Sequence, residues 1–453
     1  MIISFLREGN EKMLEKIFHL SEKKTDVKTE IIAGITTFLA MAYILAVNPI
    51  ILGESGMDTH SVFMATAISA GFASIVMGLL ANYPVSLAPG MGVNALFTYT
   101  VVLGMGHTWQ AALAAVFVSG VIFLVISVTG IRKMIINAIP KQLKLAIGAG
   151  IGFFVAFVAL KNAGIIVASD ATGVALGNLT EPTVLLAIFG IIVTIALVAK
   201  KVPAGVFVGM IITAVVGLIC GAFGLEGMPT LPSQIITTDF EMVTLGAFVQ
   251  GFADLFSDPF NCFVVIFSFL FVDFFDTAGT LVAIGNRCGL VNEKGELENA
   301  ERALLSDAVG TVIGAVLGTS TVTSFVESTS GVEAGGRTGL TACTTGVLFL
   351  LSIFISPIVL STATNAVTAP ALVVVGILMA QQLGGVDWND FVFTTAGFVT
   401  IITMILTYSI SDGIAFGFIT YAAAMVATGK AKDVSAIIWV LDLVFIAYFA
   451  LIG

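Results

Sequence analysis

The chain has 453 residues, of which 58% are hydrophobic and 11% are charged, and its formal net charge is −10. Soluble domains contain about 25% charged residues, so this composition excludes a soluble globular protein and indicates a helical protein embedded in a lipid bilayer. Because the chain is acidic and has no basic stripe, nucleic-acid binding is also excluded.

The first predicted element is a charged tail at residues 1–28. Apolar runs long enough to cross a bilayer, or half of one, follow as far as 434–452. Lys and Arg gather in the loops near 132–144, 200–201 and 287–302, whereas the loops at 53–61 and 222–241 contain Asp and Glu without Lys or Arg. The positive-inside rule therefore predicts a cytoplasmic N-terminus. The last run contains Asp442, so the sequence leaves open whether that run spans the membrane.

The first interruption of this pattern is at residues 81–96, ANYPVSLAPGMGVNAL, where two prolines and two glycines lie inside an apolar region. Non-helical backbone at membrane depth must be buried in protein or line a cavity, because lipid cannot satisfy its amides. Glycines let a flat ligand approach the backbone, and an amide both donates and accepts hydrogen bonds. We therefore predict that Gly92 and Asn94 line a ligand site.

A stretch that is apolar on one helical face, at 245–257, is predicted to be an interfacial linker helix. After it, the run FSFLFVDFFDTAGTLVAIG places Asp273 and Asp276 three residues apart, and Thr277 continues the same helix face. Ionisable residues inside a membrane indicate function. Two such carboxylates resist ionising together, and proton coupling requires a carboxyl that exchanges a proton near neutral pH. The alternative is that one Asp only bonds to a neighbouring helix.

The second interruption is at residues 318–339, GTSTVTSFVESTSGVEAGGRTG, which alternates like a strand before Glu327. We predict that Glu327 and the adjacent Ser328 are ligand groups. Glu333 and Arg337 are spaced one helical turn apart and are predicted to form a structural ion pair.

Paired interruptions in the two halves of a chain favour a secondary transporter with inverted repeats, whose site lies where the interruptions meet. Two unrelated re-entrant loops, as in a channel, are the alternative. Three carboxylates and one amide, without a buried Lys or Arg, disfavour an anion and favour a cation or a neutral molecule rich in N–H groups. The Gly-x-Gly-Asp signature of intramembrane aspartyl proteases is absent, and the four cysteines are scattered singly. The sequence therefore predicts no enzyme, no cofactor, no metal site and no disulfide framework.

Four stretches resemble the purine-specific branch of the nucleobase–cation symporter-2 family, which contains adenine permeases and guanine/hypoxanthine permeases. They are TEIIAGITTFLAMAYILAVNP (29–49), APGMGVNALF, FVDFFDTAGTL and GTSTVTSFVESTSGVEAGGRTGLTA. The resemblance implies an all-α polytopic membrane protein with about 14 transmembrane segments, arranged as two inverted repeats of seven. It also implies short strands in the broken segments 3 and 10, and a division into a core domain and a gate domain.

On this fold, the tail is followed by a first repeat at 29–240, a linker helix at 241–258 and a second repeat at 259–453. The core domain is expected from about 29–135 and 259–360, and the gate domain from about 140–222 and 367–430. The resemblance also implies the cell membrane as location, and proteins of this fold often form homodimers through the gate domain.

Residue by residue, the resemblance suggests that Asn94, Asp273 and Glu327 face the purine. From their positions in the sequence, Gly92, Thr277 and Ser328 are expected beside these residues in the substrate site. It suggests that Asp276 is the proton-linked group, with a contribution from Glu327. Asp at position 273 is similar to the guanine/hypoxanthine type, since adenine-type members often have Asn there. The expected function is proton-coupled import of guanine and hypoxanthine by alternating access, and an adenine permease is the alternative.

Overall fold

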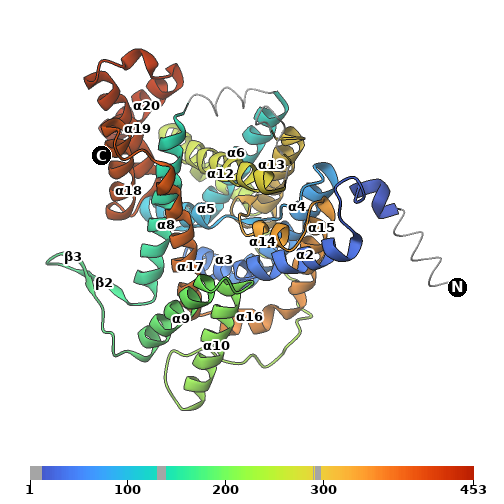
Figure 1. The fold of residues 1–453 in the computed structure, drawn as a ribbon. Coiled ribbons are helices and arrows are strands. Elements are labelled where there is room, and N and C mark those ends of the chain that lie inside the picture. Colours follow the sequence, from blue (N-terminus) through green and yellow to red (C-terminus); the bar gives the residue numbers. More distant parts are fainter. Residues whose placement is uncertain (1–12, 130–138, 289, 291–296, 453) are drawn as a thin grey trace.

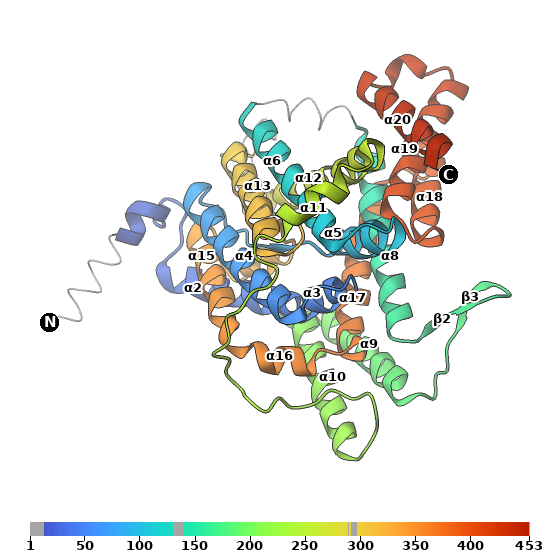
Figure 2. The same ribbon diagram turned by 180° about the vertical axis from the view of Figure 1, so that it is seen from behind.

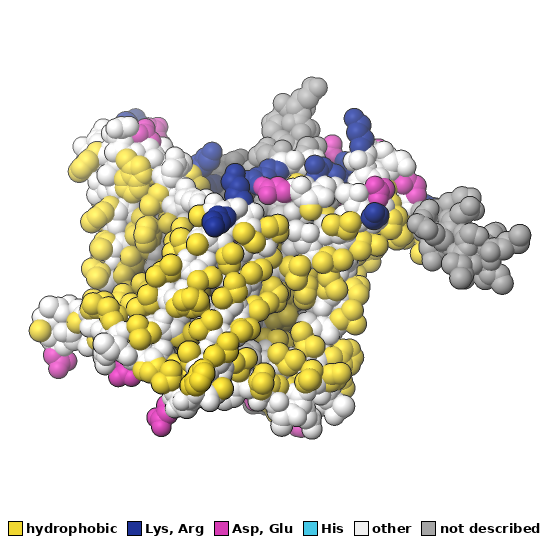
Figure 3. All heavy atoms as spheres, turned by 60° about the horizontal axis from the view of Figure 1, so that its bottom comes forward, with side chains coloured by type: hydrophobic (Ala, Val, Ile, Leu, Met, Phe, Trp, Pro, Cys, Tyr) yellow, Lys and Arg dark blue, Asp and Glu magenta, His cyan; other side chains and the backbone are white. Residues whose placement is uncertain are grey.

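The computed structural model describes residues 13–129, 139–288, 290 and 297–452. Within these residues, nine helices are long and apolar enough to cross a membrane. Figure 3 shows a broad band of hydrophobic side chains around the molecule. In this view Lys and Arg lie along the upper edge of the band, and the charged side chains at its lower edge are Asp and Glu. The chain is therefore a multi-pass membrane protein, as its composition predicts.

The helices pack as two groups, and in Figures 1 and 2 one group lies along one side of the other and underneath it. The first helix group comprises α2 (Val27–Met41), α3 (Ile44–Gly53), α4 (Thr59–Leu80), α6 (Trp109–Thr129), α12 (Pro259–Cys288), α13 (Ala300–Leu317), α14 (Ser328–Glu333) and α15 (Gly339–Ser352). The second helix group comprises α8 (Lys141–Asn162), α9 (Pro182–Ala199), α10 (Gly205–Ala222), α17 (Asn365–Ala380), α18 (Phe391–Leu406), α19 (Ile410–Ala427) and α20 (Ala436–Ile452).

Small residues let the helices of each group approach closely, as is common inside membranes. In the first group α4 packs against α15, where a Cβ atom added at Gly78 would overlap the carbonyl oxygen of Gly339. In the second group α8 packs against α17, and a Cβ at Gly152 would lie 2.8 Å from the carbonyl oxygen of Gly376.

The Gly78 contact gives a stability prediction. We expect Gly78→Val to lower the free energy of unfolding by about 1–3 kcal/mol, because the α4–α15 interface has no room for a side chain. The measurement is the Tm of the detergent-solubilised protein. Gly384→Ala is the control, because a Cβ there meets nothing within 4 Å. An unchanged Tm in the Gly78 variant would show that the interface can open without cost.

Both interruptions predicted from the sequence form short strands inside the first helix group. Strands β1 (Leu87–Pro89) and β4 (Val322–Ser324) pair antiparallel, with Leu87 opposite Ser324 and Pro89 opposite Val322. Each strand leads into a short helix. Helix α5 (Met91–Ala95) follows β1 and continues as the π-helix η1 (Leu96–Gly104), while α14 follows β4. The strand pair thus satisfies the backbone of both breaks and brings the two halves of the chain together.

The remaining elements lie at the edges of the molecule. An amphipathic helix, α11 (Phe248–Leu255), packs against α6 within the range expected for the linker. Between α8 and α9 the chain forms an exposed hairpin of β2 (Ile166–Ser169) and β3 (Gly173–Leu176), which the sequence pattern does not predict. Helix α16 (Ser356–Thr362) and three 3-10 turns, Ile353–Ile355, Gln381–Gly385 and Ala431–Asp433, connect the last helices.

Candidate functional site

Two carboxylates and a tyrosine meet beside the paired strands. The Tyr43 hydroxyl, at the interruption between α2 and α3, donates a hydrogen bond to Oε1 of Glu327 at 2.6 Å. Asp276 is close enough for its charge to act on both Glu327 and Tyr43. Its Oδ2 would lie 3.8 Å from a Cβ atom at Gly90, directly after β1. Tyr43 is 1% exposed, whereas Asp276 and Glu327 are both partly exposed. We call these three residues the carboxylate site.

Local packing places Glu327. It lies at the N-terminal boundary of α14, and that short helix rests on α2, where a Cβ atom at Gly331 would lie 2.7 Å from the carbonyl oxygen of Ala33. The Ser328 hydroxyl accepts a hydrogen bond from the backbone N–H of Ser86 at 3.0 Å. The predicted ligand group Ser328 therefore bonds one interruption to the other.

Asn94 lies one turn into the helix that follows β1. Its side-chain oxygen accepts a short hydrogen bond from the Ser320 hydroxyl, and its Nδ2 is buried without a hydrogen-bond partner among the described residues. Ser320 is next to Thr319, whose hydroxyl accepts from Asn48 at 2.9 Å. Gly92 is also buried, and a Cβ atom there would lie 2.6 Å from Cγ2 of Ile151 on α8. Gly92 thus allows close contact between the two helix groups.

Asp273 and Thr277 lie in a second polar cluster, between α12, α13 and β4. Asp273 is 2% exposed and accepts a hydrogen bond from the Thr311 hydroxyl at 3.1 Å. Thr277 donates to Oδ1 of Asp307 at 2.8 Å and lies 2.7 Å from the hydroxyl of Thr323. The structure therefore brings Asp276 to Glu327 and places Asp273 with Thr311.

Sequence reasoning missed several polar residues of this region. Asp307 is fully buried and accepts hydrogen bonds from Thr277 and Ser324. A carboxylate inside an apolar run was the signal that could have found it. Glu30 is also fully buried, and it accepts from the backbone N–H groups of Arg337 and Thr341 at 2.8 and 3.2 Å. Tyr43 and Ser320 gave no distinctive signal, because their roles depend on which residues lie opposite.

The predicted ion pair between Glu333 and Arg337 is wrong. Helix α14 ends at Glu333 and the chain turns at Gly335, with φ 106°, so helical spacing does not continue to Arg337. Glu333 instead pairs with Arg287 at 2.8 Å, and the Arg337 guanidinium donates to the carbonyls of Val332 and Gly336. Across the described parts of the chain, no three His, Cys, Asp or Glu side chains are grouped to hold a metal ion.

Comparisons with known proteins agree with a membrane permease. The sequence model of the Permease family matches residues 28–416. The chain is 51% identical to the guanine/hypoxanthine permease PbuG of Bacillus subtilis, over 96% of this chain and 99% of the relative. It is 42% identical to the adenine permease AdeP of Escherichia coli, over 96% and 95% respectively.

Among solved structures, the fold is similar to the transmembrane domain of the cyanobacterium bicarbonate transporter BicA. The TM-score is 0.59 at 15% identity, covering 87% of this chain and 97% of that one. Murine Slc26a9, an anion transporter solved in the inward-facing state, also gives 0.59 at 11% identity, over 89% of this chain and 68% of that chain.

Proposed function

Because this chain belongs to the purine-specific branch of the nucleobase–cation symporter-2 family, within the Permease family matched over residues 28–416, we propose that it carries 6-oxopurines across the membrane through the carboxylate site. It is a transporter and not an enzyme. The observation that carries the proposal is the meeting of Asp276 on α12 with Glu327, which follows β4, beside the paired strands.

The chemistry of the carboxylate site suits a purine base. Carboxylate oxygens accept hydrogen bonds from ring N–H groups, and a neutral base brings several of these into the membrane without a charge to desolvate. Tyr43 occupies one oxygen of Glu327, so the other oxygen and Asp276 are the acceptors we assign to the ligand. Asp273 stays a predicted ligand group, although its bond to Thr311 favours a role in holding α13.

Proton coupling fits the same pair of carboxylates. Two carboxyl groups that act on each other in a low-dielectric site resist ionising together, so one proton shared by Asp276 and Glu327 would be released when the site changes sides. We assign the coupled proton to Asp276. Import driven by the proton gradient, and a homodimer through the second helix group, stay predictions.

The order of the elements supports an inverted repeat of seven segments. The first repeat would consist of α2 with α3, α4, the β1–η1 segment, α6, α8, α9 and α10, and the second of α12, α13, the β4–α14 segment, α15, α17, α18 and α19. Antiparallel pairing of β1 and β4 is what a two-fold axis in the membrane plane requires.

The first helix group then corresponds to the core domain and the second to the gate domain. The edge lined by Lys and Arg in Figure 3 favours an orientation in the plasma membrane with the N-terminus in the cytoplasm.

Orientation of the Asn94 amide favours 6-oxopurines over adenine. Since Ser320 donates to the amide oxygen, the unpartnered Nδ2 is a donor, and it suits the C6 oxygen of hypoxanthine or guanine. Adenine has an amino group at that position, so a donor would face a donor. The second candidate, adenine transport, is supported by the 42% identity to AdeP.

This orientation predicts the effect of Ser320→Ala. Without the hydroxyl the amide can rotate, and we expect the preference for hypoxanthine over adenine to narrow by about tenfold, the worth of one hydrogen bond to a buried group. Competition of labelled-hypoxanthine uptake by each base measures the ratio. Ser324→Ala is the control, because that hydroxyl donates to Asp307. An unchanged ratio in the Ser320 variant would mean that the amide does not read the base.

Uptake of a nucleobase panel into proteoliposomes tests the proposed function. We expect accumulation of hypoxanthine and guanine when the outside is acidic, and loss of accumulation when a protonophore is added. A channel would equilibrate the bases regardless of the protonophore. Absence of any purine uptake by folded protein would refute the proposal.

A further inference from the structure

The two helix groups are joined by a polar contact that contains none of the three residues of the carboxylate site. Asn162, the last residue of α8 in the second group, donates through Nδ2 to Oε1 of Glu54 at 2.7 Å and to the Tyr99 hydroxyl at 2.9 Å. Glu54 directly follows α3 of the first group. Tyr99 lies in η1, which packs against α3 and α6 and is counted with that group. One amide thus bonds two elements of the opposite group.

Aromatic side chains pack next to this polar contact and also join the two helix groups. The ring of Tyr99 packs edge to face against the ring of Tyr408, which lies between α18 and α19, with 5.5 Å between the ring centroids. It also packs edge to face against Phe154 of α8, with 6.5 Å between the centroids. The ammonium of Lys161 lies 4.3 Å above the Tyr408 ring, a distance at which cations are attracted to aromatic faces. Tyr99 of the first group is therefore enclosed by side chains of the second.

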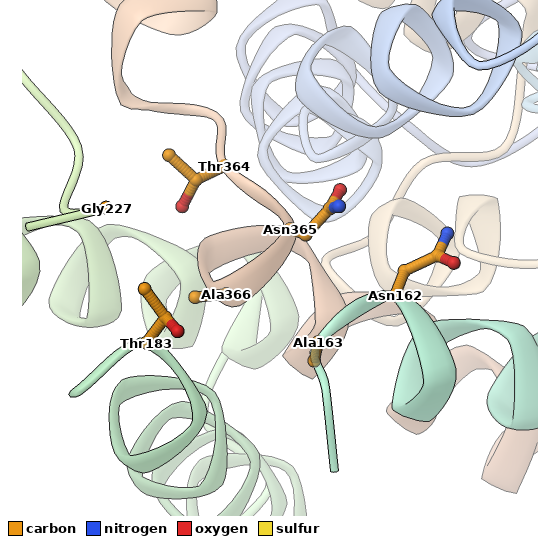
Figure 4. Close-up of a pocket in the computed structure, with 7 residues that line it drawn as sticks. All are labelled: Asn162, Ala163, Thr183, Gly227, Thr364, Asn365 and Ala366. Carbon is orange, nitrogen blue, oxygen red and sulfur yellow. The ribbon is translucent and has the colours of Figure 1, made fainter. Parts of the chain in front are cut away.

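A cavity of about 210 Å³ lies beside Asn162, and it is lined by residues of α8, α9 and α17 and of neighbouring loops. Figure 4 shows Asn162 at the end of α8 and Asn365 at the start of α17, with Thr183 and Thr364 also lining this space. Glu54 is exposed, and Asn162 is partly exposed. Water can therefore solvate Asn162 and Glu54 when the groups separate, so opening leaves neither side chain without a hydrogen-bond partner.

We propose that Asn162, Glu54 and Tyr99 form a latch that holds the two helix groups closed on this side of the membrane and must open during each transport cycle. The inference rests on the proposed function, because it requires the groups to move against each other. The acidic loop at Glu54 lies on the side assigned to the cell exterior, so the latch closes the route from outside. Losing a hydrogen bond to a charged group shifts a two-state equilibrium by about tenfold, enough for the latch to set the population of the closed state.

Cross-linking tests the latch. In the variant Glu54→Cys/Asn162→Cys, a short bifunctional methanethiosulfonate would join the groups. We expect hypoxanthine uptake to fall below about a tenth of its value before the reagent, because the closed population then cannot open, and to return when reductant is added. The matched control is His107→Cys/Asp254→Cys. This pair replaces a contact of 3.3 Å that joins the loop after η1 to α11, within the first group and its linker. It retains the four native cysteines, and cross-linking should leave its uptake unchanged.

The outcomes separate the latch from the proposed function. Full uptake by the cross-linked variant overturns the latch while purine transport stands, and absence of uptake by the unaltered protein overturns both. If the double variant shows no hypoxanthine uptake before the reagent is added, the single variant Asn162→Ala tests the latch instead. Its apparent affinity for external hypoxanthine should rise by up to about tenfold, because the closed state no longer competes with binding. An unchanged affinity in that variant would also overturn the latch.

Discussion

Glu327→Gln is expected to abolish purine binding, with a loss of affinity of about 100-fold or more. The carboxylate has one oxygen bonded to the Tyr43 hydroxyl at 2.6 Å, so a single oxygen is left to accept from the purine ring. An amide in its place has only one oxygen. If that oxygen faces Tyr43, the NH₂ donor faces the ring N–H of the purine, and both donors are left unsatisfied. If it faces the purine, the Tyr43 hydroxyl has to turn and accept from the NH₂, and the purine loses its hydrogen bond to a charged carboxylate.

Binding of labelled hypoxanthine to the detergent-solubilised protein measures this loss. Glu333→Gln is the control, because Glu333 lies at the other end of α14 and pairs with Arg287 in an exposed position. The same change of charge there should leave the affinity unaltered. Tyr43→Phe separates the two bonds of Glu327, since it frees the second oxygen and keeps the carboxylate. Wild-type affinity in Glu327→Gln would remove Glu327 from the ligand site.

Much of the arrangement around Glu327 could be predicted from the sequence, because polar residues, prolines and glycines at membrane depth are rare and have few physical explanations. The strand-like alternation before Glu327 is present as β4 at Val322–Ser324. That β4 pairs with β1 could not be predicted from the sequence. Pairing of Pro89 with Val322 depends on the two halves of the chain meeting in space, which local patterns do not encode.

Asp273 and Asp276 show that helical periodicity predicts the face on which a side chain lies but not the residues it contacts. Three residues on a helix turn by about 300°, so the two carboxylates share a face but point about 60° apart. That difference is enough to place Asp273 against Thr311 of α13 and Asp276 beside Glu327. The residues that Asp273 and Asp276 contact depend on how α12 packs between α13 and the strands, which the spacing along the sequence does not determine.

Asp307 was missed for a related reason. It lies in the run ALLSDAVGTVIG, whose mean character is apolar, and its partners Thr277 and Ser324 come from α12 and β4. The hairpin of β2 and β3 was missed because it is short and exposed, so it has no hydrophobic pattern to reveal it.

Asp276→Asn is expected to separate binding from accumulation. Asparagine keeps the shape and one acceptor oxygen of Asp276, so hypoxanthine affinity should change by less than about threefold, within the worth of a weakened hydrogen bond. It removes the group that takes up a proton beside Glu327. Exchange of labelled for unlabelled hypoxanthine across the membrane should therefore continue, whereas accumulation driven by a proton gradient should be lost.

Asp273→Asn is the matched comparison, because it makes the same chemical change three residues away on α12. Its carboxylate accepts from the Thr311 hydroxyl, and an amide oxygen can accept that bond as well, so gradient-driven accumulation should persist. Reversal of the two results, with accumulation lost only in the Asp273 variant, would assign the coupled proton to the cluster of Asp273, Asp307 and Thr311. Normal accumulation in both variants would leave Glu327 as the carboxyl that couples proton movement to transport, since it is the remaining carboxylate of the site beside the paired strands.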